Sequence, residues 1–413
     1  MPQRPLQLGL AAILGVTVLF AGSGRAAHAA TPTFEVYFTS WSFSVDTRAT
    51  LEISAPRGRL KVQLYRAGPE KTATRSASVM RGVPVDSARS VAWPGGSFRP
   101  LRVDIGYWPS GLYFARITHG GRVAYAPLVV RQSPFEHSRI AVVLPTNTWQ
   151  AYNLRDDDGD GTPDSWYASD TVTSVLLHRP FLHRGVPPRF RGYDLGFVRW
   201  LAHTGRNPDF FSDEDLEHFR SGANLAAAYD LIVFSGHEEY VTPHAYGLIR
   251  AFRDAGGNLM FLSADNFFYR VIRGDGRITR SGRWRDLGQP EAALVGAEYV
   301  NWYQGIYPNR PYTVTGYGSA PWLFAGSGLH DGSKFGNYGI EIDARAPESP
   351  AGTRVLATIP DIFGPGQTAE MTYYSLADGA KVFDAGVINF GGTANLPPVK
   401  QLVANLWNRL SQP

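Results

Sequence analysis

The residues best suited to chemistry follow a short apolar run at Leu231–Tyr240, which reads LIVFSGHEEY. A continuous apolar run of this length predicts a fully buried strand of a parallel sheet. Ligands bind outside the carboxyl ends of such strands, so His237, Glu238 and Glu239 are expected at the mouth of a site. An imidazole beside carboxylates can bind a metal ion or accept a proton from a reacting molecule.

A second buried strand, NLMFLS (Asn258–Ser263), ends in a polar turn that carries Asn266. Between the two strands, Thr242-Pro243 is typical of a helix start. Strand, helix and strand form a βαβ unit, in which both strands run in the same direction. The pattern therefore predicts that the turn lies at the same sheet edge as His237 and Glu239.

A third apolar run, RIAVVLP (Arg139–Pro145), ends in a polar cluster that includes Tyr152. By the same rule, Tyr152 is expected at the mouth of the site. A helical pattern near Asp194–His203, and a helix-starting box made by Ser212 with Asp215, place helices before the run at position 231. The order strand, helix, strand, helix, strand is typical of a doubly wound α/β sheet.

An acidic loop, DDDGDGTPD at 156–164, follows Tyr152 closely. Carboxylates at loop positions one, three, five and nine, with glycine at six, have the spacing that wraps oxygen ligands around calcium. Position twelve is Tyr167 rather than glutamate, so the loop is not a complete helix–loop–helix site. Bound calcium and a merely solvated acidic turn both remain open. The expected calcium ligands are Asp156, Asp158, Asp160, Asp164 and the backbone carbonyl of Thr162.

The composition excludes several classes of function. The chain has 413 residues, no cysteine and a formal net charge of +4. Without cysteine there is no disulfide, no cysteine-ligated zinc or iron–sulfur site, and no thiol nucleophile. The cationic residues are scattered among acids, so we expect no nucleic-acid partner. The sequence contains no G-x-S-x-G motif, which disfavours a serine hydrolase of the usual α/β kind.

The first residues are typical of an export signal. Arg4 supplies positive charge, Leu8–Phe20 is a short apolar run, and Ala27-His28-Ala29 fits a signal peptidase site. The apolar run is too short for a comfortable membrane span. We therefore expect residues 1–29 to be a signal peptide, cleaved before about Ala30. The protein would be secreted or periplasmic, without a membrane span.

Two domains are expected after that leader. Residues 30–132 contain short alternating runs such as LKVQLYRA (Leu60–Ala67), which predict an immunoglobulin-like β-sandwich. Residues 137–413 would form the doubly wound α/β domain. An aromatic-rich stretch at about 270–340 shows no clear period and is expected to be an insertion that could cap the site.

The second domain resembles the class I glutamine-amidotransferase-like fold, a flavodoxin-like arrangement with a cysteine on a sharp turn after the strand equivalent to Asn258–Ser263. This chain has Ala264 and Asp265 there, so amidotransferase chemistry is excluded. More specifically, the motifs PTNTWQAYN, SGHEEY, GGNLMFLSADNFFYR and YGIEID in combination resemble the large (beta) subunit of bacterial N,N-dimethylformamidase and its relatives.

This resemblance implies one iron ion held by two tyrosines and a glutamate, with a histidine and an asparagine close by. Phenolate and carboxylate are hard anionic ligands that favour ferric iron (Fe³⁺). The resemblance implies that the histidine accepts a proton and that the asparagine donates to the developing oxyanion. The implied iron ligands are Tyr113, Tyr152 and Glu239, and the implied catalytic residues are His237 and Asn266.

The implied activity is metal-dependent hydrolysis of the C–N bond of a small N-substituted, formamide-like amide. The large subunit of the family works with a small subunit, so a partner subunit or a homo-oligomer is an open expectation. Glu341, Asp343 and Glu370 are weaker candidates outside the catalytic set.

Two alternatives stay open. His237, Glu239 and His244 could hold zinc, although the HExxH spacing is absent. The protein could also be a non-catalytic exported module, stabilised by calcium, whose aromatic residues bind a carbohydrate or a cell-wall ligand.

Overall fold

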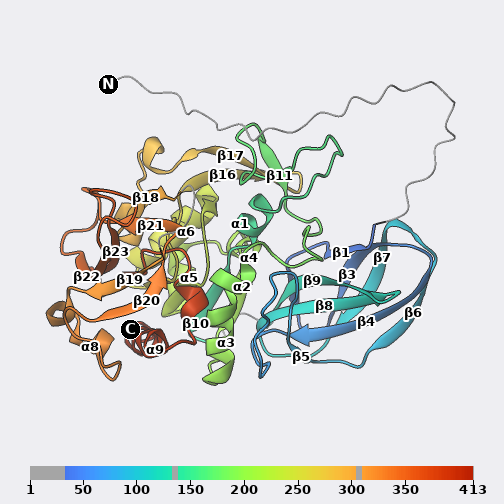
Figure 1. Cartoon of the computed structure of the whole chain (residues 1–413), viewed down its shortest axis with the longest axis horizontal. Coiled ribbons are helices and arrows are strands. Elements are labelled where there is room, and N and C mark those ends of the chain that lie inside the picture. Colours follow the sequence, from blue (N-terminus) through green and yellow to red (C-terminus); the bar gives the residue numbers. More distant parts are fainter. Residues whose placement is uncertain (1–32, 133–137, 304–308, 413) are drawn as a thin grey trace. The chain divides into compact units, whose positions relative to one another are not determined.

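The computed structural model describes residues 33–132, 138–303 and 309–412 (Figure 1). The expected signal peptide at 1–29 and the expected start of the second domain at 137 lie outside the described residues. Within the described ranges, no helix is long and apolar enough to cross a membrane. The chain is a mixed α/β protein with several sheets.

Residues 33–132 form two sheets that share one apolar core. The alternation predicted along Leu60–Ala67 is confirmed, because Leu60, Val62 and Leu64 are buried. They meet side chains of the facing sheet such as Leu51, which is the packing of a β-sandwich. The smaller sheet has the order β1 (Glu35–Phe38), β3 (Thr47–Ala55) and β7 (Gly96–Ile105). The larger has the order β2 (Ser42–Ser44), β9 (Arg122–Arg131), β8 (Gly111–His119), β4 (Gly58–Arg66) and β5 (Val83–Pro84), with β6 (Arg89–Trp93) also paired to β4.

A nine-stranded sheet forms the centre of the second part. Its order is β12 (Asp209–Ser212), β10 (Ile140–Leu144), β13 (Leu231–Phe234), β15 (Asn258–Phe261), β24 (Lys381–Asp384), β23 (Ala369–Ser375), β22 (Arg354–Ile359), β19 (Arg310–Val314) and β20 (Lys334–Tyr338). The first five strands are parallel, and the last four continue the sheet in antiparallel fashion. The predicted βαβ unit is confirmed, since β13 and β15 pair in parallel.

Apolar side chains leave the parallel strands on both faces of this sheet. Along β13, Leu231 and Val233 join one core cluster, whereas Ile232 and Phe234 join another. Each cluster is completed by helices, so both faces are covered and the strands are apolar throughout. The first cluster includes α3 (Leu195–His203) and α9 (Val399–Leu410), and the second includes α5 (Gly222–Ala228) and α6 (Pro243–Asp254).

The predicted helix starts are confirmed. The Thr242 hydroxyl accepts a hydrogen bond from the backbone N–H of Ala245 at 3.1 Å and caps α6. Ser212 and Asp215 form the capping box of α4. The remaining helical segments are α1 (Thr146–Ala151), α2 (Phe190–Tyr193), α4 (Asp213–Leu216), α7 (Ala292–Val295), α8 (Pro321–Phe324), and the 3₁₀ turns η1 (Arg285–Leu287), η2 (Tyr317–Ser319) and η3 (Gly391–Thr393).

The stretch at 270–340 contains regular strands, unlike the aperiodic insertion expected. A four-stranded sheet has the order β11 (Ser174–Leu176), β17 (Arg277–Arg283), β16 (Tyr269–Gly274) and β14 (Tyr240–Val241), and β18 (Glu298–Trp302) pairs with β21 (Glu341–Ala344). β19 and β20 of the same stretch belong to the main sheet. Register shifts at Arg270/Val271 and at Tyr299/Asn301 break the alternation, which is why a period of two was not visible in the sequence.

Candidate active site

The candidate site lies where three parallel strands end. β10, β13 and β15 pair side by side, so the residues that follow them meet at one edge of the sheet. There the Tyr152 hydroxyl donates a hydrogen bond to Glu239 Oε2 over 2.7 Å. Two side chains from separate strand ends thus converge, as the sequence predicted.

His237 stands among three carboxylates. Its Nε2 atom lies 3.4 Å from Glu239 Oε2, 3.4 Å from Asp265 Oδ2 and 3.5 Å from Glu341 Oε2. Ligand atoms of His237, Glu239 and Asp265 all lie within 4.8 Å of one another, close enough for one cation to bridge them. The group can therefore hold a metal ion or pass a proton between imidazole and carboxylate.

Neighbouring elements fix the segment that carries His237 and Glu239. A Cβ atom on Gly236 would lie 2.0 Å from Asp194 Oδ1, so a larger residue would have to displace this buried carboxyl. The Thr148 hydroxyl in α1 accepts a hydrogen bond from the backbone N–H of Glu239 at 3.1 Å. Because Tyr152 follows the same helix directly, α1 positions both partners of the Tyr152–Glu239 pair.

The turn after β15 is strained. Asp265 has a φ of 57° and Phe267 a φ of 59°, in the left-handed region that L side chains rarely adopt. The backbone N–H of Asp265 donates to Asp343 Oδ1 at 2.8 Å and holds the turn. Strain of this kind concentrates at functional sites, and here it brings the Asp265 carboxylate beside His237.

The later strand β21 supplies two further acids. Glu341 and Asp343, regarded as weaker candidates from the sequence, both reach the site. Glu370 does not, because it pairs with Arg345 at 3.0 Å.

The site holds more carboxyl groups than its imidazole can neutralise. Burial raises the pKa of Glu239 and of Glu341, and burial together with the Glu239 and Asp343 charges raises the pKa of Asp265. Asp265 Oδ1 and Glu341 Oε2 have no hydrogen-bond partner in the described ranges. Buried charge without a partner is costly, so these groups require either protons or a bound cation.

The phenol of Tyr152 is held in its protonated form by these surroundings. Burial raises its pKa well above the ordinary value, and the charges of Glu239 and Glu341 raise it further. A cation beside the hydroxyl would act in the opposite direction, because positive charge favours the phenolate. Tyr152 can thus become an anionic ligand when a cation is present.

Glu238, which the sequence placed at the site mouth, belongs to a second buried group of acids. Its pKa is raised well above the ordinary value by burial and by the charge of Asp213. Burial also raises the pKa of Asp213 to about 6 and that of Asp194 to about 7. Asp213 accepts a hydrogen bond from the backbone N–H of Asn147 at 2.7 Å, which fixes this group at the start of α1.

Asn266 lies next to the site, but its donor group is engaged. Its Nδ2 donates to the carbonyl of Ser263 and to Asp384 Oδ1, each at 3.1 Å. Both amide hydrogens are therefore used within the fold. The geometry does not support the expected oxyanion donor and indicates that Asn266 holds the turn after β15.

Tyr113 is not brought to the site. It is fully buried in the core of the β-sandwich, its ring lies 5.5 Å from that of Trp108, and its hydroxyl donates to the carbonyl of Pro109 at 2.7 Å. Burial raises its pKa to about 12. The alternation of β8 turns Tyr113 inward between the two sheets, so its expected place among the iron ligands is corrected.

Tyr240 takes a place that the sequence did not assign. Burial and the adjacent charge of Glu239 raise its pKa well above the ordinary value, and its ring lies 6.2 Å from that of Tyr152. The only signal in the sequence was its position directly after Glu239.

His244 does not join the site, because its Nε2 lies 2.9 Å from the carbonyl of Phe219. The zinc set that included His244 is therefore not formed.

A cavity of about 420 Å³ opens onto the acidic group, with Glu239, Asp265 and Glu341 in its lining. A cavity of this size suits a small organic ligand. Its aromatic lining consists of Trp166, Tyr167, Tyr240, Phe268, Tyr269, Tyr299 and Trp302, together with Tyr152.

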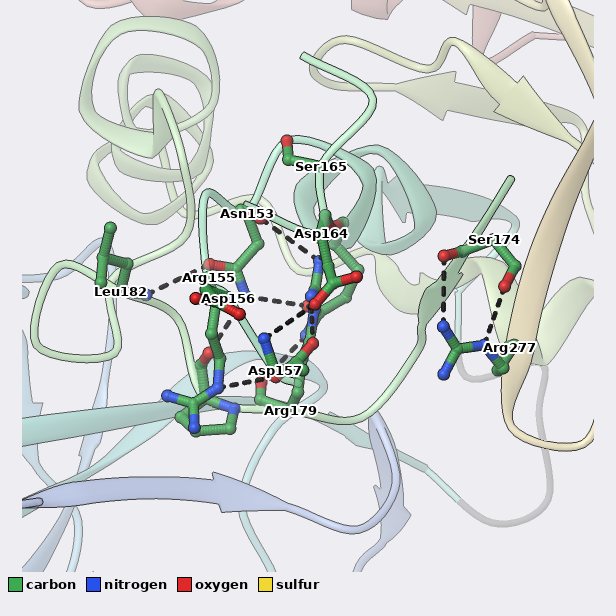
Figure 2. A network of polar contacts seen from close by, with 12 residues as sticks. Asn153, Arg155, Asp156, Asp157, Asp164, Ser165, Ser174, Arg179, Leu182 and Arg277 are labelled. Carbon is green, nitrogen blue, oxygen red and sulfur yellow. Dashed lines mark hydrogen bonds and ion pairs between the residues drawn. The ribbon is translucent and has the colours of Figure 1, made fainter. Parts of the chain in front are cut away.

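A buried arginine ties the acidic loop to the site (Figure 2). Arg179 forms an ion pair with Asp157 of the loop. Its Nη2 atom also donates to the carbonyls of Gln150 at 2.9 Å and Asn153 at 3.3 Å. These two residues flank Tyr152, so Arg179 clamps the backbone on both sides of it.

The loop carboxylates accept hydrogen bonds from their own backbone. Asp156 accepts from the N–H groups of Gly159 and Gly161 at 2.7 and 2.8 Å. The N–H of Thr162 donates to Asp160 at 2.6 Å. Oxygen atoms of Asp156, Asp158 and Asp164 lie within 4.8 Å of one another, whereas Asp160 is not part of that group.

Residues 92–401 match the protein family described as N,N-dimethylformamidase beta subunit-like, C-terminal. No curated protein matches the chain. Similar solved structures include the mmIFT52 N-terminal domain (10% identity, 50% of this chain and 86% of that chain, TM-score 0.32). An uncharacterized protein from Bacillus anthracis gives 11% identity over 23% and 80% of the two chains with a TM-score of 0.18. A superoxide reductase (neelaredoxin) from Ignicoccus hospitalis is 14% identical over 25% of this chain and 80% of that chain, with a TM-score of 0.16. At these scores the solved structures carry no argument about function.

Proposed function

The chain belongs to the N,N-dimethylformamidase beta subunit-like family, and we propose that it is an exported metal-dependent amidohydrolase. It would cleave the C–N bond of a small N-substituted, formamide-like amide with a single ferric ion. The observation that carries the proposal is the contact of 2.7 Å between the Tyr152 hydroxyl and Glu239 Oε2, inside a buried group of three acids that share one imidazole.

The residues present fit a hard cation. Tyr152 and Glu239 would hold it, and Asp265, Glu341 and Tyr240 stand next to them for the remaining positions. Phenolate and carboxylate oxygens favour ferric iron over zinc. In the part of the chain that the structure describes, Asp265 Oδ1 and Glu341 Oε2 accept no hydrogen bond, although Glu341 Oε2 lies 3.5 Å from His237 Nε2, and a cation would satisfy both oxygen atoms.

A ferric ion bound there would supply Lewis acidity, polarising the substrate carbonyl and activating a water molecule. The chain would move the protons. His237 Nε2 lies within reach of Glu239 and Asp265, so the imidazole can accept a proton from the attacking water and return it to the leaving amine. The reaction would consume one amide and one water molecule and would yield one carboxylic acid and one amine. Phe268 and Tyr299 in the cavity lining would limit access of bulk water.

The finer fold assignment belongs to the same proposal. We infer an immunoglobulin-like sandwich followed by a flavodoxin-like domain, supported by the two sheets of 33–132 and by five parallel strands covered on both faces. The family description as a beta subunit supports the proposal of a partner subunit, and a mass measurement on the purified protein would show whether it is a homo-oligomer instead.

The test uses the purified chain loaded with ferric iron. Ferric phenolate absorbs visible light, so we expect a coloured protein with one iron per chain that hydrolyses N-substituted formamides. Tyr152→Phe and Tyr240→Phe should each lower the absorption per iron. Tyr113→Phe is the matched control and should leave colour and activity unchanged. An iron-loaded, folded protein without colour or hydrolysis would refute the proposal.

A second candidate has one specific observation in its favour. Tyr167 and Trp302 in the cavity lining are half exposed, as in sites that stack on sugar rings. The chain would then be an exported module, stabilised by calcium at the acidic loop, that binds a carbohydrate or cell-wall ligand without catalysis. A colourless, iron-free protein that binds oligosaccharides would favour this candidate.

A further inference from the structure

We propose that Arg280 binds a carboxylate on the substrate, so that the substrates are N-substituted amides with an aromatic body and an anionic end, such as N-acyl aromatic amino acids. This inference rests on the proposed function and names the substrate class of the same site. Arg280 lies on β17 and lines the cavity that opens onto Glu239.

Arg280 is held in a fixed position without its donors being used. Its guanidinium carbon lies 4.9 Å from the ring centroid of Tyr269 and 5.8 Å from that of Trp166, which orients the group through cation–π contacts. Its side chain is 20% exposed. Among the described residues its one ion-pair partner is Asp170, at 3.8 Å and 98% exposed, which is a weak interaction. Its charge also acts on Glu239, which lines the same cavity. The planar fork of donors therefore faces a cavity with no acceptor assigned to it.

The neighbouring arginines differ from Arg280 in the contacts of their guanidinium groups. Each of them has a close partner within the fold, whereas Arg280 does not. Arg273 pairs with Glu214, Arg277 donates to Ser174 at 2.9 Å, Arg283 pairs with Asp286 at 2.6 Å, and Arg285 pairs with Glu291.

The charges in the cavity would also orient the substrate. Within the described lining, Arg280 is the one Lys or Arg side chain. The acid beside it, Asp170, is 98% exposed and so screened by water, whereas the acids Glu239, Asp265 and Glu341 gather at the proposed catalytic group. A carboxylate would be repelled by those acids and attracted by Arg280. An anionic amide would therefore bind with its carboxylate on Arg280 and its amide towards His237.

The remaining lining selects the body of the ligand. Phe268, Tyr269, Tyr299 and Trp302 present aromatic surface in a cavity of about 420 Å³. That volume exceeds what a dimethylamide needs and accommodates an aromatic side chain. Apolar burial would supply affinity, and the Arg280 fork would supply selectivity.

The test compares N-formylphenylalanine with N-formylphenethylamine, which is the same molecule without the carboxylate. A charge-assisted bidentate contact predicts about a 10- to 100-fold higher kcat/KM for the anion. Arg280→Gln should reduce kcat/KM for the anion at least about tenfold more than for the neutral amide, and Arg280→Lys should lie between. Arg283→Gln, on the same strand but paired outside the cavity, is the matched control and should keep the preference.

Binding is measured separately by quenching of tryptophan fluorescence, because Trp166 and Trp302 line the cavity. Binding of N-formylphenylalanine that depends on Arg280, without hydrolysis of either compound, would support the anion site and refute the amidohydrolase. Hydrolysis of both compounds without preference would refute the anion site and leave the amidohydrolase standing. Equal preference in the wild type and in Arg280→Gln with an unchanged melting temperature would also overturn the inference.

Discussion

Two acidic groups in this chain carry similar side chains in opposite surroundings. In the loop at 156–164, hydrogen bonds from the backbone of Gly161 and Gly159 lower the pKa of Asp156. In the buried group around His237, burial raises the pKa of Glu239 and Asp265. Asp156 can therefore stay ionised in water without a cation, whereas the carboxyl groups of Glu239 and Asp265 require protons or a bound cation. The loop can be recognised in the sequence from the spacing of its carboxylates. The capacity of the other group for chemistry comes from its burial, which the spacing of residues does not reveal.

Neutralising one carboxylate in each group gives the largest expected contrast. Glu239→Gln removes a proposed ligand, so iron binding and amide hydrolysis should fall by more than about a hundredfold, the upper limit for residues that only support a ligand. Asp158→Asn in the exposed loop should change either quantity by less than about threefold, since it touches no residue of the site. Metal analysis and steady-state kinetics measure both. Comparable losses in the two variants would show that the groups are not functionally distinct.

Asp194, in the second buried group of acids beside Glu238, should also impose a pH dependence on stability that the loop does not. The folded pKa of Asp194 is raised to about 7 by burial, so between about pH 4 and pH 7 the folded state binds more protons than the unfolded state. The contribution of Asp194 to the unfolding free energy is therefore greatest below about pH 4. It falls by up to about 4 kcal/mol as the pH rises through 7. Asp194→Asn cannot ionise and should flatten the curve, becoming more stable than wild type above pH 7.

Urea unfolding of wild type and Asp194→Asn at several pH values between 4 and 8 measures this difference. Asp156→Asn is the control and should not gain stability at high pH, because the pKa of Asp156 is lowered rather than raised. Parallel curves for wild type and Asp194→Asn would contradict the assignment.

Arg179 connects the two groups, and its removal should destabilise both. Arg179→Ala removes the buried ion-pair partner of Asp157, which keeps Arg155 as its other partner, and the Nη2 donor to the carbonyls of Gln150 and Asn153. This loss should cost about 3 kcal/mol of unfolding free energy. Arg277→Ala is the control, because its contact with Ser174 is partly exposed and should contribute less than about 1 kcal/mol. Chemical denaturation distinguishes the two variants. If Arg179→Ala lost less stability than Arg277→Ala, the conclusion that Arg179 clamps the backbone around Tyr152 would be contradicted.

Elements with local signals could be predicted from the sequence. The strand at 231–234, the cap at Thr242 and the box at Ser212 each depend on neighbouring residues, and the structure confirms them. The stretch at 270–340 could not be predicted, because register shifts and pairing with distant strands hide its period. Long-range pairing leaves little trace in a short window of sequence.

The same division applies to the site. The meeting of Tyr152 with Glu239 followed from the rule for strand ends. Asp265 was missed as a site residue because its place depends on a left-handed turn held by Asp343, which lies far away in the chain. Tyr113 was misplaced because both faces of β8 are buried, so the sequence gave no sign that its ring points into the sandwich core.

The smallest expected effect concerns calcium at the acidic loop. We predict that calcium at about 10 mM raises the unfolding free energy by roughly 1.5 kcal/mol, as expected for a weak extracellular-type site that binds the folded state alone. The three oxygen atoms of Asp156, Asp158 and Asp164 within 4.8 Å of one another support this expectation. Asp158→Asn removes one of these charges while keeping an acceptor for the N–H of Asp160, so it should abolish the calcium effect without changing stability in its absence. Thermal unfolding with calcium, with magnesium and with neither metal measures this effect. If both metals stabilised the protein equally, or if calcium stabilised wild type and Asp158→Asn equally, the loop would be a solvated turn held by its own backbone.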